Sequence, residues 1–207
     1  MSISDKSLFN PSGNKPQAGF RRAELLAGTS GTSASFFSGT QTLHFSVQLD
    51  AAKPLNYSHE YQLVFIESSD YSTNQIVLKT GTILDGTSSQ KSQPKYLRLF
   101  GNLKSSPPKV LYETSFTTGW HNFALQFDFS KNQVQTFYSK EQEALKSVGA
   151  AASNDLSGQG EFHFGLLKKP TGTSDVVNSG YQESKINEGI IYGGIYEEAG
   201  VLGCSTS

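Results

Sequence analysis

The chain has 207 residues, with 17 basic and 18 acidic side chains, a formal net charge of −1, and 14 Phe, 9 Tyr and 1 Trp. This length suits one globular domain or at most two small ones. The balanced charge gives no support to a nucleic-acid-binding surface, and apolar runs such as 63–66 and 190–195 are far shorter than the ~20 residues of a membrane-spanning helix. We therefore expect a chain that binds neither nucleic acid nor membrane.

The sequence also lacks the motifs of several kinds of site. The single cysteine, Cys204, cannot close an intrachain disulfide, and no Cys/His spacing resembles a zinc site. Neither the Gly-x-Ser-x-Gly motif of serine hydrolases nor a glycine-rich phosphate-binding loop is found. The first residues contain no apolar segment typical of a secretory signal peptide. We expect no metal site and no disulfide.

Apolar residues recur with period two in run after run, a pattern that predicts half-buried antiparallel strands. In chain order the predicted strands are residues 19–26, 42–50, 59–67, 75–80, 96–100, 121–129, 161–169 and 189–197. Only residues 139–147 have a helix-forming composition, whereas the segment 85–94 is predicted to form a turn.

Seven or more strands with one short helix and no long linker predict an all-β fold. We expect one domain over residues 1–207, in which two antiparallel sheets form a β-sandwich of jelly-roll, concanavalin-like type with a concave cleft for polysaccharide. A closed barrel is the alternative fold.

Several strands carry polar or aromatic side chains on the face that alternation directs away from the core. In residues 59–67, alternation assigns Tyr61, Leu63 and Phe65 to the core. In the last predicted strand it assigns Ile191 and Ile195 to the core. The side chains left on the opposite faces are Arg22, Glu24, Glu60, Gln62, His163, Lys169 and Tyr192. Each position by itself is equally compatible with an ordinary solvated strand. Together they predict a sugar-binding cleft, because polar groups bond to hydroxyls and flat rings stack on pyranoses.

Five blocks of sequence resemble glycoside hydrolase family 131, secreted fungal β-glucanases with a β-jelly-roll fold. The blocks are residues 19–25, 58–65, 165–172, 180–183 and 186–194, and they include the uncommon string Lys168-Lys169-Pro170-Thr171-Gly172. The likeness extends from about Ser4 to Glu198, which is nearly the whole chain.

The resemblance implies hydrolysis of β-1,3-, β-1,6- and β-1,4-linked glucans with inversion at the anomeric carbon and without a cofactor. It also implies an extracellular, secreted enzyme, and we expect a monomer whose partner is the β-glucan substrate. Family members carry a signal peptide and further residues before the segment matched by residues 3–9. We therefore expect the chain to lack the N-terminal part of the family domain and one wall of its cleft.

Inverting hydrolysis needs a carboxylic acid and a carboxylate base that are ~6.5–9.5 Å apart. We predict that Glu24 and Glu60 form this pair, since both lie in family-like blocks and on non-core faces. Arg22 would keep Glu24 ionised as the base, and the aromatic neighbours of Glu60 would raise its pKa as the acid. The reverse assignment of roles remains open, and Glu67 and Glu188 are the reserve candidates.

Further side chains are predicted to hold the glucan. They are Arg22, Gln62, His163, Lys169, Gln182 and Tyr192.

Two other functions remain open. In a jelly-roll polysaccharide lyase, Arg22, Gln62, His163 and Tyr192 would neutralise a uronate and abstract a proton. In a non-catalytic module, the same surface would bind glucan without cleaving it.

Overall fold

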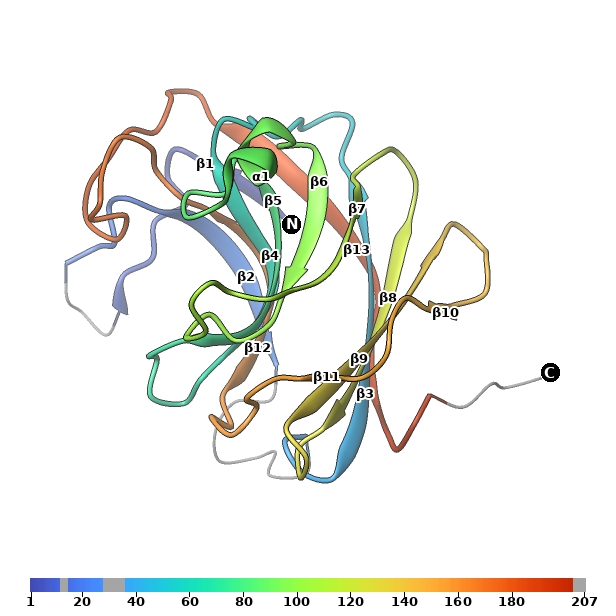
Figure 1. Ribbon diagram of the computed structural model, residues 1–207. Helices are drawn as coiled ribbons and strands as arrows, with labels where there is room; N and C mark the ends of the chain where they lie inside the picture. Colours follow the sequence, from blue (N-terminus) through green and yellow to red (C-terminus); the bar gives the residue numbers. More distant parts are fainter. Residues whose placement is uncertain (12–14, 28–35, 203–207) are drawn as a thin grey trace.

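The computed structural model describes residues 1–11, 15–27 and 36–202. The fold consists of two antiparallel sheets packed face to face (Figure 1). The first sheet has the strand order β1-β13-β3-β8-β9-β10, and β11 also pairs with β9. Its strands are β1 (Ser2–Ser4), β3 (Thr40–Leu49), β8 (His121–Asp128), β9 (Gln133–Lys140), β10 (Lys146–Ser147), β11 (Ala152–Ser153) and β13 (Asn187–Ala199).

The second sheet has the strand order β2-β12-β4-β5-β6-β7. Its strands are β2 (Arg21–Ala27), β4 (Glu60–Glu67), β5 (Asn74–Gly81), β6 (Tyr96–Phe100), β7 (Val110–Ser115) and β12 (Glu161–Lys168). The predicted two-sheet β-sandwich is confirmed. No helix of the described residues is long and apolar enough to cross a membrane.

The predicted helix over residues 139–147 is wrong. Strand β9 continues to Lys140, a turn follows with Glu141 at a φ of 50°, and β10 begins at Lys146. The helix α1 (Ser88–Ser92) instead lies in the segment predicted as a turn, where Thr87 and Gln90 form a reciprocal capping box. Local capping therefore decided the position of the helix, and strand pairing overrode the helix-forming composition of residues 139–147.

The main core lies between the two sheets and is built from large apolar side chains. Phe45, Phe123 and Phe127 contribute to it from the first sheet, and Leu63 and Phe164 contribute from the second. Burial of each such side chain stabilises the fold by roughly 1.5–3 kcal/mol. The other face of the second sheet carries a smaller apolar cluster and the polar side chains of the candidate site.

Strand β4 departs from simple alternation because it carries one extra residue. Its pairing with β5 shifts register between Gln62 and Val64, and both Leu63 and Val64 are buried in the core between the sheets. Beyond this bulge the parity of the strand reverses. Phe65, which was predicted to belong to the main core, therefore lies on the outer face, in a smaller apolar cluster with Val77.

The predicted faces are also reversed in the first half of the last strand, whereas Ile195 packs against the core as predicted. Ile190 is 1% exposed and belongs to the core, whereas Ile191 is 40% exposed. Tyr192 packs against the core, and its hydroxyl lies 2.7 Å from the carbonyl oxygen of Leu63 and 2.5 Å from that of Gly165 in the other sheet. The prediction that Tyr192 faces a substrate is therefore wrong.

Candidate active site

Three strands on one side of the second sheet bring the candidate side chains together on its outer face. Glu24 of β2 pairs with Gly165 of β12, and His163 of β12 pairs with Phe65 of β4. The imidazole of His163 stacks on the ring of Phe65 with 4.1 Å between ring centroids and 12° between planes. The ring of His163 is thus fixed in orientation on the outer face of the sheet, on the strand between β2 and β4.

His163 lies between two carboxylates. Its Nδ1 is 3.1 Å from Oε2 of Glu24, and its Nε2 is 3.4 Å from Oε2 of Glu67. A third carboxylate, that of Glu161, lies 3.9 Å from the same Nε2. Glu67 was only a reserve candidate, and it reaches this site because the bulge in β4 turns it to the outer face.

The charge of Glu24 is set by its two basic neighbours. Arg22 donates from Nε to Oε1 at 3.0 Å and from Nη2 to Oε2 of Glu24, a bidentate contact. Burial raises the pKa of Glu24, but the hydrogen bonds from His163 and Arg22 outweigh it, and the net pKa is lowered. Burial likewise lowers the pKa of His163, and its contacts with Glu24 and Glu67 outweigh this, so the net pKa is raised. Glu24 is therefore ionised at neutral pH.

Gly165 allows this close approach of β2 and β12. A Cβ at this position would lie 2.2 Å from the carbonyl oxygen of Ala23 and 2.6 Å from Cα of Glu24. Gly165 was not among the predicted site residues. A glycine inside an alternating strand is the available signal, since it often marks a close backbone approach.

The structure places Glu60 apart from this group. Its side chain is 0% exposed, and its Oε1 lies 2.9 Å from Nζ of Lys79 and 2.8 Å from Nζ of Lys169. Its Oε2 accepts a hydrogen bond from the backbone of Leu84 at 2.8 Å. Burial would raise the pKa of Glu60, but the two lysines lower it to about 2. The expected raised pKa of an acid is therefore wrong for Glu60, and Lys169 contacts this carboxylate.

Glu188, the other reserve candidate, belongs to a buried polar network. Its Oε1 accepts a hydrogen bond from Lys168 at 2.7 Å, and its Oε2 accepts one from the hydroxyl of Tyr61 at 2.8 Å. Lys168 also contacts Glu183, which lies 3.0 Å from Nε2 of His59. This network neutralises the charge of Lys168, whose side chain is fully buried. A structural role therefore explains why Glu188 is buried here.

The remaining predicted substrate-binding residues are bonded to the protein itself. Gln62 accepts a hydrogen bond from the side chain of Asn74 at 3.1 Å. Gln182 donates to the backbone carbonyl of Gly19 at 2.8 Å, which joins the segment after β12 to the start of β2. Of the predicted site residues, the structure therefore brings together Arg22, Glu24 and His163.

The assembled group can move protons between carboxylates and a bound molecule. The two contacts and the width of one imidazole ring place the two Oε2 atoms of Glu24 and Glu67 at most about 9 Å apart, so they are no farther apart than the ~6.5–9.5 Å between the carboxyl groups of inverting glycosidases. Within the described part of the chain, no group of three or more His, Cys, Asp or Glu side chains is arranged to hold a metal ion.

Comparisons with known proteins agree with this fold. The model of the glycoside hydrolase 131 catalytic N-terminal domain matches residues 1–203. The structure is similar to the catalytic domain of a GH131 β-glucanase from Podospora anserina, with a TM-score of 0.73 and 24% identity over 98% of this chain and 72% of that one. It is also similar to the catalytic domain of the glycoside hydrolase family 131 protein from Coprinopsis cinerea, with a TM-score of 0.65 and 20% identity over 98% of this chain and 70% of that one.

A search of curated proteins gave no match. The likeness to the two solved structures shows the fold, and the family model adds the chemistry that the fold alone does not give. Because that model matches nearly the whole length, the chain belongs to glycoside hydrolase family 131 and is a glycoside hydrolase.

Proposed function

We propose that the chain hydrolyses β-glucans, with Glu24 and Glu67 as the two carboxylates of the reaction. The observation that carries this proposal is the position of His163, which contacts Glu24 through one ring nitrogen and Glu67 through the other. The β-glucan substrate is supported by the related catalytic domain from Podospora anserina, which is a β-glucanase.

The environments of the two carboxylates differ and favour different roles. Glu24 is held ionised by Arg22 and its side chain is 5% exposed, so it serves as the base that takes a proton from the attacking water. The side chain of Glu67 is 28% exposed, so it is the group within reach of a leaving oxygen and serves as the acid. Water then attacks the anomeric carbon on the face opposite the departing sugar, which inverts the configuration. His163 orients both carboxylates.

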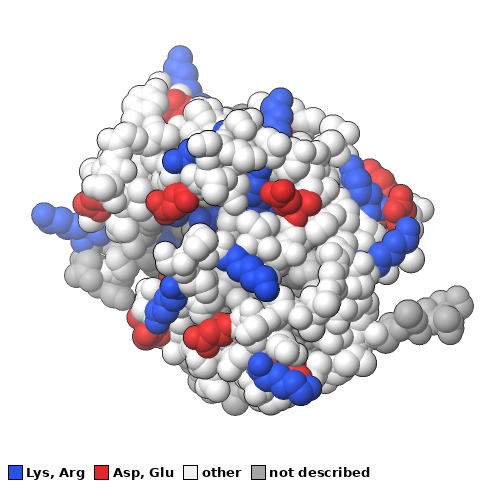
Figure 2. All heavy atoms as spheres, in the orientation of Figure 1, with Lys and Arg blue, Asp and Glu red and all other residues white. Residues whose placement is uncertain are grey.

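Uncharged glucan suits the site better than a uronate polymer, because the carboxylates of Glu24, Glu67 and Glu161 all lie beside His163. Figure 2 shows basic and acidic side chains interspersed over the face in view, with no field of one sign. The alternative polysaccharide lyase would also need Tyr192 beside Arg22 and His163, but the hydroxyl of Tyr192 lies between the sheets. We accordingly assign the chain to hydrolysis of neutral β-1,3-, β-1,6- or β-1,4-linked glucans and, by its likeness to the family, to the extracellular space.

The carboxylates are tested with Glu24→Gln and Glu67→Gln, assayed by release of reducing ends from β-1,3-, β-1,6- and β-1,4-glucans. Each variant should lose activity by about 100-fold or more, because each removes a proton-transfer group. Glu67→Gln should lose much less on aryl glucosides with good leaving groups, since these need little protonation. NMR of the first product should show the inverted anomer.

Glu161→Gln is the matched control, because Glu161 is the third carboxylate beside His163 and lies farther from it. It should keep activity near that of the wild type. Wild-type rates in Glu24→Gln or Glu67→Gln would remove that residue from the mechanism. Binding of glucan by the wild type without any release of reducing ends would favour the non-catalytic module.

A further inference from the structure

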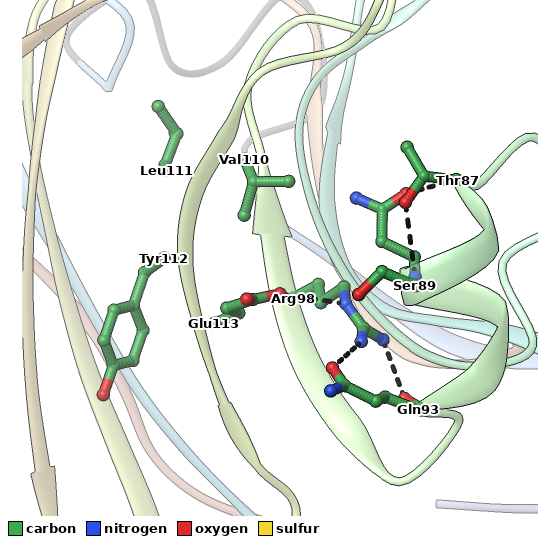
Figure 3. Close-up of a pocket in the computed structure, with 9 residues that line it drawn as sticks. Thr87, Ser89, Gln93, Arg98, Val110, Leu111, Tyr112 and Glu113 are labelled. Carbon is green, nitrogen blue, oxygen red and sulfur yellow. Dashed lines mark hydrogen bonds and ion pairs between the residues drawn. The ribbon is translucent and has the colours of Figure 1, made fainter.

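A cavity opens at the edge of the second sheet that is farthest from Glu24. Its volume is about 410 Å³, and it lies between α1 and β7 (Figure 3). The polar side chains that line it are Thr87, Ser89, Gln90, Gln93, Arg98 and Glu113. In Figure 3, Arg98 and Glu113 turn toward α1, whereas Tyr112 points to the other side of β7.

The chemistry of this cavity is polar without a net charge. Arg98 is 0% exposed, and its Nε lies 3.1 Å from Oε2 of Glu113. Its Nη1 and Nη2 donate to the backbone and side-chain oxygens of Gln93 at 3.0 and 3.3 Å. Because Arg98 has no exposed surface and is bonded to Glu113 and Gln93, the groups open to a ligand are the carboxylate of Glu113, the amides and the hydroxyls, which together offer both donors and acceptors. This combination suits an uncharged ligand rich in hydroxyl groups, whereas an anion would meet the half-exposed carboxylate of Glu113.

The cavity lies on a line of cross-strand partners that leads back to the candidate active site. From β7 to β2, the successive partners on the outer face are Glu113, Arg98, Lys79, Gln62, Leu167 and Arg22. Neighbouring strands are ~4.8 Å apart, so this line runs across the strands for about 24 Å. It ends at Arg22, which holds Glu24. Between the two ends of this line the side chains are buried, and Lys79, Gln62 and Leu167 are each 5% exposed. They would therefore lie beneath a polysaccharide that extends across the strands from the carboxylates toward the cavity.

We propose that the cavity between α1 and β7 is a distal sugar-binding subsite for the glucan chain whose reacting bond lies at Glu24 and Glu67. This inference rests on the proposed function. Sugar units bound in the cavity hold the chain in register at the reacting carbon, so hydrolysis becomes faster once the chain is long enough to reach the cavity.

The test fills the cavity without changing Arg98 or its partners. Ser89 and Ser88 are both exposed on α1, and Ser89 lines the cavity whereas Ser88 does not. Ser89→Trp places a large ring in the cavity, and Ser88→Trp places the same ring elsewhere on the same short helix. Thermal unfolding of both variants checks that the helix and fold are kept.

The kcat/KM of each protein is measured on gluco-oligosaccharides from the disaccharide to the octasaccharide. For the wild type and Ser88→Trp it should rise with chain length. Ser89→Trp should match them on the short oligosaccharides and be at least about tenfold slower on the long ones, which corresponds to ~1.4 kcal/mol of lost transition-state binding. The inference is overturned by an unchanged length dependence in Ser89→Trp, an equal loss in Ser88→Trp, or a wild-type rate that does not depend on length.

A binding experiment separates failure of the subsite from failure of the proposed function. If the wild type hydrolyses none of these oligosaccharides, the proposed function fails, and calorimetric affinities of the three proteins for the octasaccharide still decide the subsite. Weaker binding to Ser89→Trp alone supports it. Equal affinities, or no binding to any of the three proteins, overturn it.

Discussion

Arg22 and His163 show how neighbouring cations can override burial at a carboxylate. The side chain of Glu24 is almost fully buried, and burial alone would favour its protonated form. The bidentate contact with Arg22 and the hydrogen bond with His163 reverse this preference. Because the folded-state pKa of Glu24 is lowered, its contribution to stability is present above its unfolded-state pKa and is lost as pH falls through the folded-state value.

Replacing Arg22 tests this account through the pH dependence of activity. In Arg22→Met, the pKa of Glu24 should rise, because the nearest cation is removed. The base would then be protonated at a higher pH, so the acidic limb of the kcat/KM profile should move upward by the same amount. The measurement is kcat/KM on one soluble glucan across the acidic pH range.

Arg21→Met is the control, because Arg21 bonds to the backbone carbonyls of Ala18 and Phe20 rather than to Glu24. Its acidic limb should coincide with that of the wild type. If the limb of Arg22→Met also stays in place, Arg22 does not set the ionisation of the catalytic base.

At the scale of elements, the pairing of β2 with β12 depends on the absence of a side chain at Gly165. The carbonyl oxygen of Ala23 and the Cα of Glu24 occupy the space that a Cβ would need. The position of the candidate base is thus fixed by the backbone of the neighbouring strand.

Gly165→Ala should therefore displace β2 and carry Glu24 away from His163. Because a misplacement of about 1 Å can cost ~100-fold in rate, we expect a loss of that order in kcat/KM together with a lower melting temperature. Gly149→Ala is the control, since nothing lies within 4 Å of a Cβ built there. Full activity in Gly165→Ala would show that β2 accommodates the methyl group without moving Glu24.

Strands could be predicted from the sequence where apolar and polar residues alternate regularly. The strand predicted over residues 121–129 is observed as β8, which ends at Asp128. β7 and β9 were missed, because β7 is an exposed edge strand and Thr136 takes a core-facing place in β9. Among the site residues, alternation correctly turned Glu24 and His163 outward. It failed for Glu67 and Tyr192, because one register shift in each strand reverses the faces, and register depends on strand pairing.

For the molecule as a whole, Tyr192 joins the two sheets behind the candidate active site. Its hydroxyl reaches from β13 to the carbonyl oxygens of Leu63 and Gly165, which belong to β4 and β12. Both carbonyl groups lie where the pairing between β4 and β12 shifts register. One proton shared between two buried acceptors therefore supports the irregular part of the second sheet.

Tyr192→Phe should lower the free energy of unfolding by roughly 1–3 kcal/mol, because buried acceptors lose their hydroxyl donor while the ring still packs. Urea unfolding measures this loss. Tyr196→Phe is the matched control on the same strand, since the ring of Tyr196 is exposed, and it should be close to neutral. Equal unfolding free energies for Tyr192→Phe and the wild type would show that the hydroxyl contributes nothing to joining the sheets.

The extra residue in β4 changes the direction of all the side chains that follow it in the strand. Residues before it keep their facing, and every residue after it is inverted, which takes Glu67 from the interior to the surface that carries His163. A point substitution in this stretch changes one group, whereas removal of one residue would exchange the two faces of the whole segment after it. The presence of a candidate acid in this enzyme thus depends on the length of one strand as much as on the identity of its residues.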